Sequence, residues 1–190
     1  EDCACAVGSK FKENYAGSLG LAGSFSFHPR KSITTGEGGM VTTNNKKFAE
    51  KVIMLRNHGA SISEEKRYSS KKSYILSDFS LPGLNYRLTD IQGALGLAQL
   101  KKLNSILYFR NKWAHYYIDN LKNISWIETP HIPKYSFHSW QAFVIKIKSE
   151  YIKGYNRDKI LKLLLNKSIG ARPGTHSIHN LSFYKNKLKF

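Results

Sequence analysis

The chain has few cysteines and none in a spacing typical of zinc sites. Its two cysteines, Cys3 and Cys5, cannot build the disulfide framework of a small secreted domain. They lie two positions apart in a segment that alternates like a strand, so we expect both to be buried thiols on one face. Reduced thiols favour the cytoplasm, and we expect no metal.

Long apolar segments are also missing. No run approaches the roughly 18 to 20 residues that span a bilayer, so we expect no membrane partner. Hydrophobic residues still make up 41% of the 190 residues and aromatic residues 13%, which is typical of a folded globular protein. The opening stretch EDCACAVG resembles the tail of a strand, and we therefore expect the chain to be a fragment of a longer protein.

Acidic residues are scarce, with 13 Asp and Glu against 30 Lys and Arg and a net charge of +17. Such a charge suits the phosphates of a nucleic acid. However, only seven of the basic residues are arginine, the side chain that binds bases and phosphates in a bidentate manner. The lysines are scattered in pairs along the chain. We interpret the charge as solubilising and expect no nucleic-acid partner.

Strand and helix patterns alternate along the chain, which predicts an α/β fold. The predicted strands cover residues 1–7, 24–29, 38–43 and 139–148. The predicted helices cover residues 44–59, 88–103, 106–121 and 156–170. Residues 60–80 are polar and are predicted to form a long excursion, and no terminal element is expected after the loop at 171–181.

Capping residues mark the starts of three predicted helices. Thr89 and Gln92 have the spacing of a capping box. Asn44 or Asn45 is expected to cap the first helix, and Asn156 the last one. These signals are local, so they fix where a helix begins without any knowledge of the rest of the fold.

Common catalytic motifs are missing: the chain has no G-x-S-x-G, no P-loop or dinucleotide fingerprint, and no H-E-x-x-H. Lys31 remains, just before the glycine-rich stretch 36–39. A lysine amine can form a Schiff base with the aldehyde of pyridoxal 5'-phosphate. Asp2 could then face the cofactor's ring nitrogen and Ser26 its phosphate. From these residues alone, a surface turn and a phosphate cradle remain open alternatives.

Four ordered segments resemble the motifs of one enzyme family. They are EDCACAVG (1–8), FSFHPRKSITTGEGGMV (25–41), LRNHG (55–59) and GLNYRLTDIQGALGLAQL (83–100). They resemble DegT/StrS-type sugar aminotransferases, which are pyridoxal-phosphate enzymes of the aspartate aminotransferase fold, fold type I. The resemblance implies transfer of an amino group, usually from glutamate, to a nucleotide-linked keto-sugar in polysaccharide or secondary-metabolite biosynthesis. It also implies a homodimer with sites shared across the interface.

The resemblance assigns roles to individual residues. Lys31 would form the Schiff base and move the proton between carbons. Asp2 would pair with the pyridinium nitrogen, Ala4 would pack on the ring, and Ser26 would bind the cofactor phosphate. Asn85 would reach the phosphate of the partner subunit.

Substrate contacts are implied at three further positions, Arg87, Arg172 and His176. Arg87 would hold the donor carboxylate, and the other two lie in ARPGTHSIHNL (171–181), where the resemblance is weaker. Family members often carry Gln, His or Glu where this chain has Cys5, which leaves Cys5 as a candidate contact only. A lysine at position 31 speaks against the related sugar dehydratases, which have His there.

The resemblance also predicts a domain division. Residues 1–105 would form the C-terminal part of the large mixed-sheet, cofactor-binding domain, and residues 106–190 a truncated small α/β domain. Relatives are longer, and their N-terminal part supplies phosphate-binding amides and a residue that stacks on the ring. We expect the fragment alone to be inactive. The alternative is a degenerate, non-catalytic fragment that acts as a folding or interaction unit.

Overall fold

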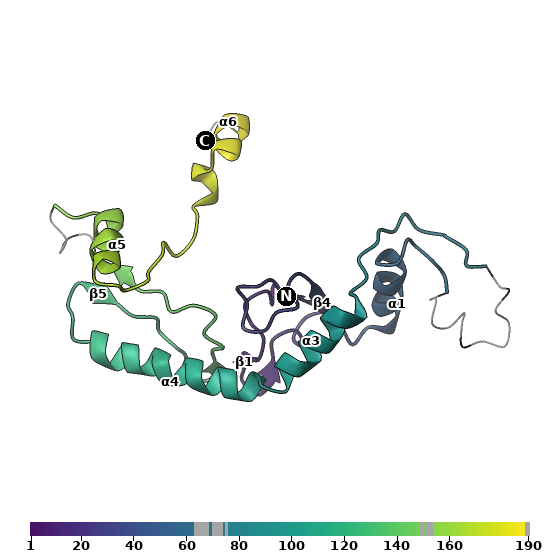
Figure 1. The fold of residues 1–190 in the computed structure, drawn as a ribbon, viewed down its shortest axis with the longest axis horizontal. Coiled ribbons are helices and arrows are strands. Elements are labelled where there is room, and N and C mark those ends of the chain that lie inside the picture. Colours follow the sequence, from purple (N-terminus) through teal and green to yellow (C-terminus); the bar gives the residue numbers. More distant parts are fainter. Residues whose placement is uncertain (63–68, 70–73, 75, 149, 151–153, 189–190) are drawn as a thin grey trace. The chain divides into compact units, whose positions relative to one another are not determined.

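The computed structural model describes residues 1–62, 69, 74, 76–148, 150 and 154–188 and has a mixed α/β architecture (Figure 1). The chain divides into two compact units. The first comprises residues 1–115 and 132–142, and the second residues 116–131 and 143–190. The assignment of 1–105 to a large domain and 106–190 to a small one stays a prediction.

The first unit holds two small sheets and most of the helical residues. One sheet has the antiparallel order β2-β1-β6, from Asn14–Tyr15, Lys10–Phe11 and Ser136–Phe137. In the other, β3 (Gly23–Ser26) pairs with β4 (Gly39–Thr42), in the register Gly23↔Thr42 to Ser26↔Gly39. The helices are α1 (Lys46–Leu55), α3 (Asp90–Leu100) and α4 (Leu103–Leu121), which continues into the second unit.

The two central strand predictions are confirmed, but the strand predicted at 1–7 is wrong. Only Asp2 bridges β3, in parallel to Ser24, and the chain then turns at Ala4–Cys5. The N–H of Ala6 donates to the carbonyl of Cys3 at 3.0 Å and closes this turn. Because the turn ends the alternation, Cys3 is 1% exposed whereas Cys5 is exposed. The expectation of two buried thiols is therefore wrong for Cys5.

The predicted helix starts are confirmed. Asn45 caps α1 by accepting from the N–H of Phe48 at 2.9 Å. The Thr89 side chain accepts from the N–H of Gln92, while the Gln92 side chain accepts from the N–H of Thr89 at 3.0 Å, a complete capping box. Each cap satisfies backbone donors that the first helical turn cannot satisfy itself.

One buried cluster of the first unit includes residues at both ends of the loop that carries Lys31. Phe27 and Ile33 are 7% and 2% exposed, and they cluster with Val7. Partly buried side chains from β3 and α4 pack against this cluster: Phe25, Leu103 and Ile106. Burying side chains of this size stabilises a fold by about 1.5 to 3 kcal/mol each. The loop between Phe27 and Ile33 is thus fixed at both ends by apolar burial.

The second unit is built from short elements. β5 (Ile127–Glu128) pairs antiparallel with β7 (Lys146–Ile147), and α5 (Arg157–Asn166) follows with Asn156 as its predicted N-cap. The 3₁₀ turn η2 (Ile178–Asn180) and the helix α6 (Ser182–Leu188) complete the described part. None of the second unit's described side chains is fully buried.

Two further predictions are wrong in this part of the chain. The strand predicted at 139–148 is reduced to Lys146–Ile147, because Trp140 takes a left-handed backbone conformation with φ of +52° and breaks the extended path. A terminal element is present, since α6 begins at Ser182. Most of the excursion predicted at 60–80 lies outside the described residues. Among the described helices, none is both long and apolar enough to cross a membrane.

The capping box of α3 gives a stability prediction. Thr89→Ala removes a side-chain acceptor from the first helical turn and is expected to lower the free energy of unfolding by about 1 kcal/mol. Urea denaturation followed by circular dichroism measures the change. Thr89→Ser, which keeps the hydroxyl, is the control and should retain most of that energy. Equal losses in both variants would show that the cap contributes nothing.

Candidate active site around Lys31

Lys31 lies in a tight turn directly after β3. The N–H of Lys31 donates to the carbonyl of His28 at 2.9 Å, which places Pro29 at the second position of the turn. Proline is favoured there because its ring fixes the required φ, and it also ends the strand because it has no N–H to donate. The sequence His28-Pro29 therefore determines locally where the strand stops and the lysine loop begins.

The far end of this loop is closed onto Phe27. The N–H of Thr35 and the hydroxyl of Thr34 both donate to the carbonyl of Phe27, at 3.0 and 2.8 Å. Thr35 itself is 5% exposed, and its hydroxyl donates to the carbonyl of Glu37 at 2.7 Å. Residues 28–34 thus form a loop with a hydrogen-bonded base, and Lys31 lies in its middle.

The amine of Lys31 contacts the thiol of Cys5. Lys31 Nζ donates to Cys5 Sγ at 3.0 Å, and the lysine is half-buried. Within the described part of the chain, no carboxylate lies within ion-pair distance of this amine. Cys5, only a candidate contact from the sequence, is thus the direct neighbour of Lys31.

Asp2 and Ser26 lie on one face of the β3 sheet. Asp2 is paired with Ser24, and the N–H of Cys3 donates to the carbonyl of Ser24 at 2.9 Å. Paired residues and residues two apart on a strand share a face, so Asp2, Ser24 and Ser26 point to the same side. The opposite face carries the buried Cys3 and Phe27. The polar face is therefore not part of the buried core.

The remaining bonds of Asp2, Ala4 and Ser26 are short-range. Asp2 Oδ1 accepts from the N–H of Ala4 at 3.1 Å, which places Ala4 at the start of the turn that presents Cys5. Ser26 Oγ accepts from the N–H of His28 at 3.4 Å. In this contact the Ser26 oxygen accepts, so its O–H can donate to an anion at the same time. The structure brings these predicted residues and Lys31 together in one unit.

Two groups beside Asp2 have shifted pKa values. The N–H groups of Gly17 and Gly20, with a smaller contribution from Leu19, donate to the Glu1 carboxylate and lower its pKa. Burial raises the pKa of the Cys3 thiol. Glu1 is thus held as a carboxylate against the 17–20 loop and Cys3 as a neutral thiol, and both fix the backbone on either side of Asp2.

Asn85 and Arg87 form a separate cluster. Asn85 bridges Asn57, and Arg87 Nη1 donates to Asn57 Oδ1 at 2.6 Å. Both residues are exposed, and the described contacts include none between them and Lys31. The capping residue Gln92 links the start of α3 to the glycine-rich stretch, because its Nε2 donates to the carbonyl of Glu37 at 2.9 Å.

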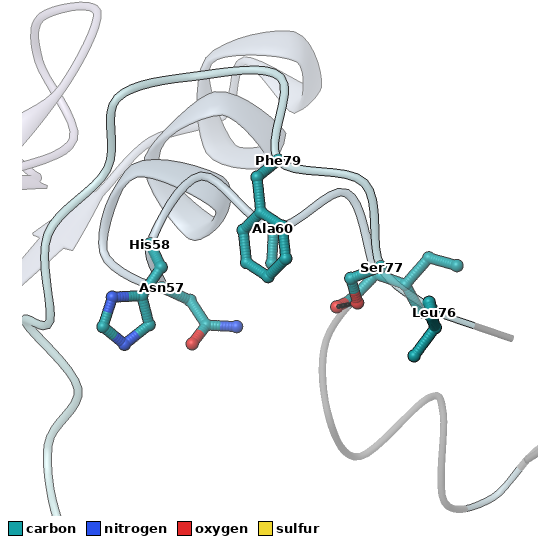
Figure 2. A pocket seen from close by; sticks show the side chains of 7 residues that line it. Asn57, His58, Ala60, Leu76, Ser77 and Phe79 are labelled. Carbon is teal, nitrogen blue, oxygen red and sulfur yellow. Dashed lines mark hydrogen bonds between the residues drawn. The ribbon is translucent and has the colours of Figure 1, made fainter. Parts of the chain in front are cut away.

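A cavity of about 300 Å³ lies next to this cluster, and Figure 2 shows the side chains around it. It is lined by Asn57, His58, Ala60, Ile62, Leu76, Ser77 and Phe79. None of the predicted site residues lines it, although Asn57 connects it to Arg87. The cavity is therefore distinct from the Lys31 site.

Arg172 and His176 are exposed in the second unit, in the segment between α5 and η2. Their substrate role stays a prediction. Across the part of the chain that the structure describes, no group of three or more His, Cys, Asp or Glu side chains is arranged to hold a metal ion.

Sequence reasoning missed the segment 139–141. Gln141 Oε1 accepts from the hydroxyl of Ser32 at 3.2 Å, and Gln141 Nε2 donates to the carbonyl of Arg30. The hydroxyl of Ser139 donates to the carbonyl of Cys5 at 3.1 Å. These contacts join residues more than 100 positions apart, and no local pattern signals them.

Comparison with known proteins identifies the family. A model of the DegT/DnrJ/EryC1/StrS aminotransferase family matches residues 1–189. The chain belongs to this family. Aminotransferases of this family depend on pyridoxal phosphate, which agrees with the resemblance read from the sequence motifs.

Individual relatives match almost the whole chain. GDP-perosamine synthase from Caulobacter vibrioides is 34% identical and covers 97% of the chain, which is 46% of that protein. Helicobacter pylori PseC, an aminotransferase involved in pseudoaminic acid biosynthesis, matches with a TM-score of 0.86 and 29% identity over 100% of the chain and 48% of its own. The PLP-form of the putative sugar aminotransferase Spr1654 from Streptococcus pneumoniae gives 0.79 and 28%, over 100% and 46%.

The chain spans about half the length of the curated relatives it matches. Its mixed α/β structure corresponds to a similar share of the solved aminotransferases, which confirms the predicted fold class.

His138, which precedes the segment 139–141, gives a prediction about how stability depends on pH. His138 Nδ1 accepts from the N–H of Trp140 at 2.9 Å, and burial lowers the pKa of His138 below its usual 6.5. The unfolded chain therefore binds this proton more readily than the folded chain. The resulting stability is fully present above about pH 6.5 and is lost as the pH falls through the lowered pKa.

Urea denaturation at pH 7.5 and 5.5 tests this dependence. His138→Asn keeps an acceptor at the position of Nδ1 but does not titrate, so the difference between the two pH values should shrink in this variant. An unchanged pH dependence would show that another group is responsible.

Proposed function

We propose that this chain carries the reacting lysine of a pyridoxal-phosphate aminotransferase that transfers an amino group from glutamate to a nucleotide-linked keto-sugar. The observation that carries the proposal is the contact of Lys31 Nζ with Cys5, in the same unit as the polar face of Asp2 and Ser26 and in a chain of an aminotransferase family. An amine free of carboxylate partners and set in a fixed loop is suited to covalent bonding with an aldehyde.

The residues fit the cofactor by their chemistry. Lys31 supplies the amine, Asp2 a carboxylate for the ring nitrogen and Ser26 a hydroxyl for the phosphate. Ala4, at the turn between Asp2 and Cys5, is small enough for a flat ring to lie against it. The carboxylate and the hydroxyl share one sheet face, as a ligand with a basic nitrogen and a phosphate requires.

Each side chain then has a defined task. When bound, pyridoxal phosphate supplies an aldehyde that bonds to amines and a ring that withdraws electrons from the substrate carbon. Asp2 keeps the ring nitrogen protonated, and Ser26 donates a hydrogen bond to a phosphate oxygen. Lys31 Nζ takes a proton from the donor carbon and returns one to the acceptor carbon, as general base and general acid in turn.

The substrate class rests on the relatives. One is a GDP-perosamine synthase and another an aminotransferase of pseudoaminic acid biosynthesis, both concerned with sugars. We extend this to a keto-sugar linked to a nucleotide, in polysaccharide or secondary-metabolite biosynthesis. Arg87 is proposed for the donor carboxylate, and Arg172 and His176 for the sugar substrate.

A homodimer in the cytoplasm completes the proposal. Helix α3 exposes large apolar side chains, among them Ile91 at 83% and Leu97 at 63%, which is typical of a surface that another subunit covers. Asn85 is exposed five residues before the start of α3, and we propose that it reaches the phosphate bound by the partner subunit. The free thiols of Cys3 and Cys5 suit a reducing compartment.

The proposed covalent site predicts a single modified lysine. In the native gene product that contains these residues, pyridoxal phosphate followed by borohydride should fix the cofactor on Lys31, as read by peptide mass spectrometry. Lys31→Ala should abolish that adduct, the visible absorption band of the lysine-bound cofactor, and amino transfer from glutamate.

Lys102, an exposed lysine directly before α4, gives the matched control, and Lys102→Ala should keep the adduct, the band and the turnover. Retention of all three in Lys31→Ala would overturn the assignment. A native product that binds no cofactor at all would favour the degenerate, non-catalytic alternative.

The phosphate contact predicts a binding change. Ser26→Ala removes a hydroxyl that donates to a charged phosphate, worth about 1.5 to 3 kcal/mol, and so should weaken cofactor affinity by roughly 10- to 150-fold. Fluorescence titration of the native gene product measures this affinity. Ser24→Ala, on the same sheet face two residues earlier, is the control. Equal effects of the two variants would remove Ser26 from the phosphate site.

A further inference from the structure

The segment Ser139–Gln141 contacts Cys5 and the two residues that flank Lys31. We propose that Gln141 is a positioning residue for Lys31: it bonds the backbone of Arg30 on one side of the lysine and the side chain of Ser32 on the other, so that Nζ stays beside Cys5. This inference rests on the proposed function in one respect: it takes pyridoxal phosphate as the group that bonds to Lys31. The contacts themselves all lie within the first unit.

Gln141 holds the residue before Lys31 and the residue after it. Its Nε2 donates to the carbonyl of Arg30, and its Oε1 accepts from the hydroxyl of Ser32 at 3.2 Å. A side-chain amide donates and accepts through one rigid planar group, so both contacts are made in a single orientation. Lys31 thus lies between two residues that are both hydrogen-bonded to Gln141.

Ser139 fixes the other side of the contact. It is 1% exposed, and its hydroxyl donates to the carbonyl of Cys5 at 3.1 Å. Its N–H donates to the hydroxyl of Ser9 at 3.1 Å, which ties the same segment to the start of the neighbouring sheet. The separation between Lys31 Nζ and Cys5 Sγ therefore depends on the spacing between Ser139 and Gln141.

Trp140 sets that spacing. It is 3% exposed and has a φ of +52°, an unfavourable backbone conformation for a bulky residue. Three bonds hold it there: its carbonyl accepts from Arg110 at 2.7 Å, its ring nitrogen donates to Asn111 at 3.2 Å, and its N–H donates to His138 at 2.9 Å. These bonds hold Trp140 in its unfavourable conformation, and we infer that this conformation is needed to place Ser139 and Gln141.

Gln99 on α3 provides a matched comparison within the same loop. Its Nε2 donates to the carbonyl of Thr34 at 2.7 Å, and its Oε1 accepts from the N–H of Thr34 at 3.0 Å. It is therefore also a glutamine with two bonds to the lysine loop. Its partner lies three residues beyond Lys31, so its loss weakens the loop without releasing the neighbours of the lysine.

The experiment compares Gln141→Met with Gln99→Met in the native gene product, prepared without cofactor. One measurement is the rate at which pyridoxal phosphate and borohydride modify Lys31. The other is the rate at which trinitrobenzenesulfonate, which needs no defined geometry, modifies the same lysine. Quantitative mass spectrometry of peptides gives both rates.

We expect opposite changes in Gln141→Met. Fixation by pyridoxal phosphate should fall by about tenfold because the amine is misplaced. Modification by trinitrobenzenesulfonate should rise by roughly two- to threefold because the loop opens locally. Gln99→Met should change each rate by less than about twofold, since the anchors beside Lys31 stay in place.

A second pair of variants tests the same point with a smaller change. Ser32→Ala removes one of the two Gln141 bonds and should give an intermediate loss, which Ser32→Thr should restore. Equal changes in the two glutamine variants, or no effect of Ser32→Ala, would overturn the proposal. If pyridoxal phosphate fails to modify Lys31 in the unaltered protein, the proposed function falls, while the trinitrobenzenesulfonate rates still decide on the positioning role.

Discussion

The burial of Phe27 and Ile33 on either side of one loop is the constraint on which the rest of the site depends. Both side chains are anchored in the core, so the five residues between them have little freedom to move. The carbonyl of Phe27 also accepts hydrogen bonds from the hydroxyl of Thr34 and the N–H of Thr35 at the far end of the loop. The backbone position of Lys31 is set relative to this fixed base.

Local signals in the sequence predicted a good part of this structure. Capping residues gave the starts of α1, α3 and α5, because a cap and its helix are separated by only a few positions. Pro29 and the glycine-rich stretch marked the limits of β3 and β4 for the same reason. The family motifs led to Lys31, Asp2 and Ser26, which the structure gathers in one unit.

The predictions that failed depended on contacts between distant parts of the chain. Alternation suggested that Cys3 and Cys5 share a buried face, but the turn at Ala4 exposes Cys5 to Lys31. Alternation also suggested a strand through Trp140, which tertiary hydrogen bonds hold in a left-handed conformation instead. Gln141 could not be recognised at all, because its partners lie about 110 positions earlier.

That separation has a consequence for the order in which the protein matures. Ribosomes add about 5 to 20 residues per second, so roughly 5 to 20 s pass between the synthesis of Ser32 and that of Gln141. During that interval Phe27 and Ile33 are already synthesised, but Gln141 is not. The contacts of Gln141 that flank the amine are therefore completed by a segment made well after the residues it holds.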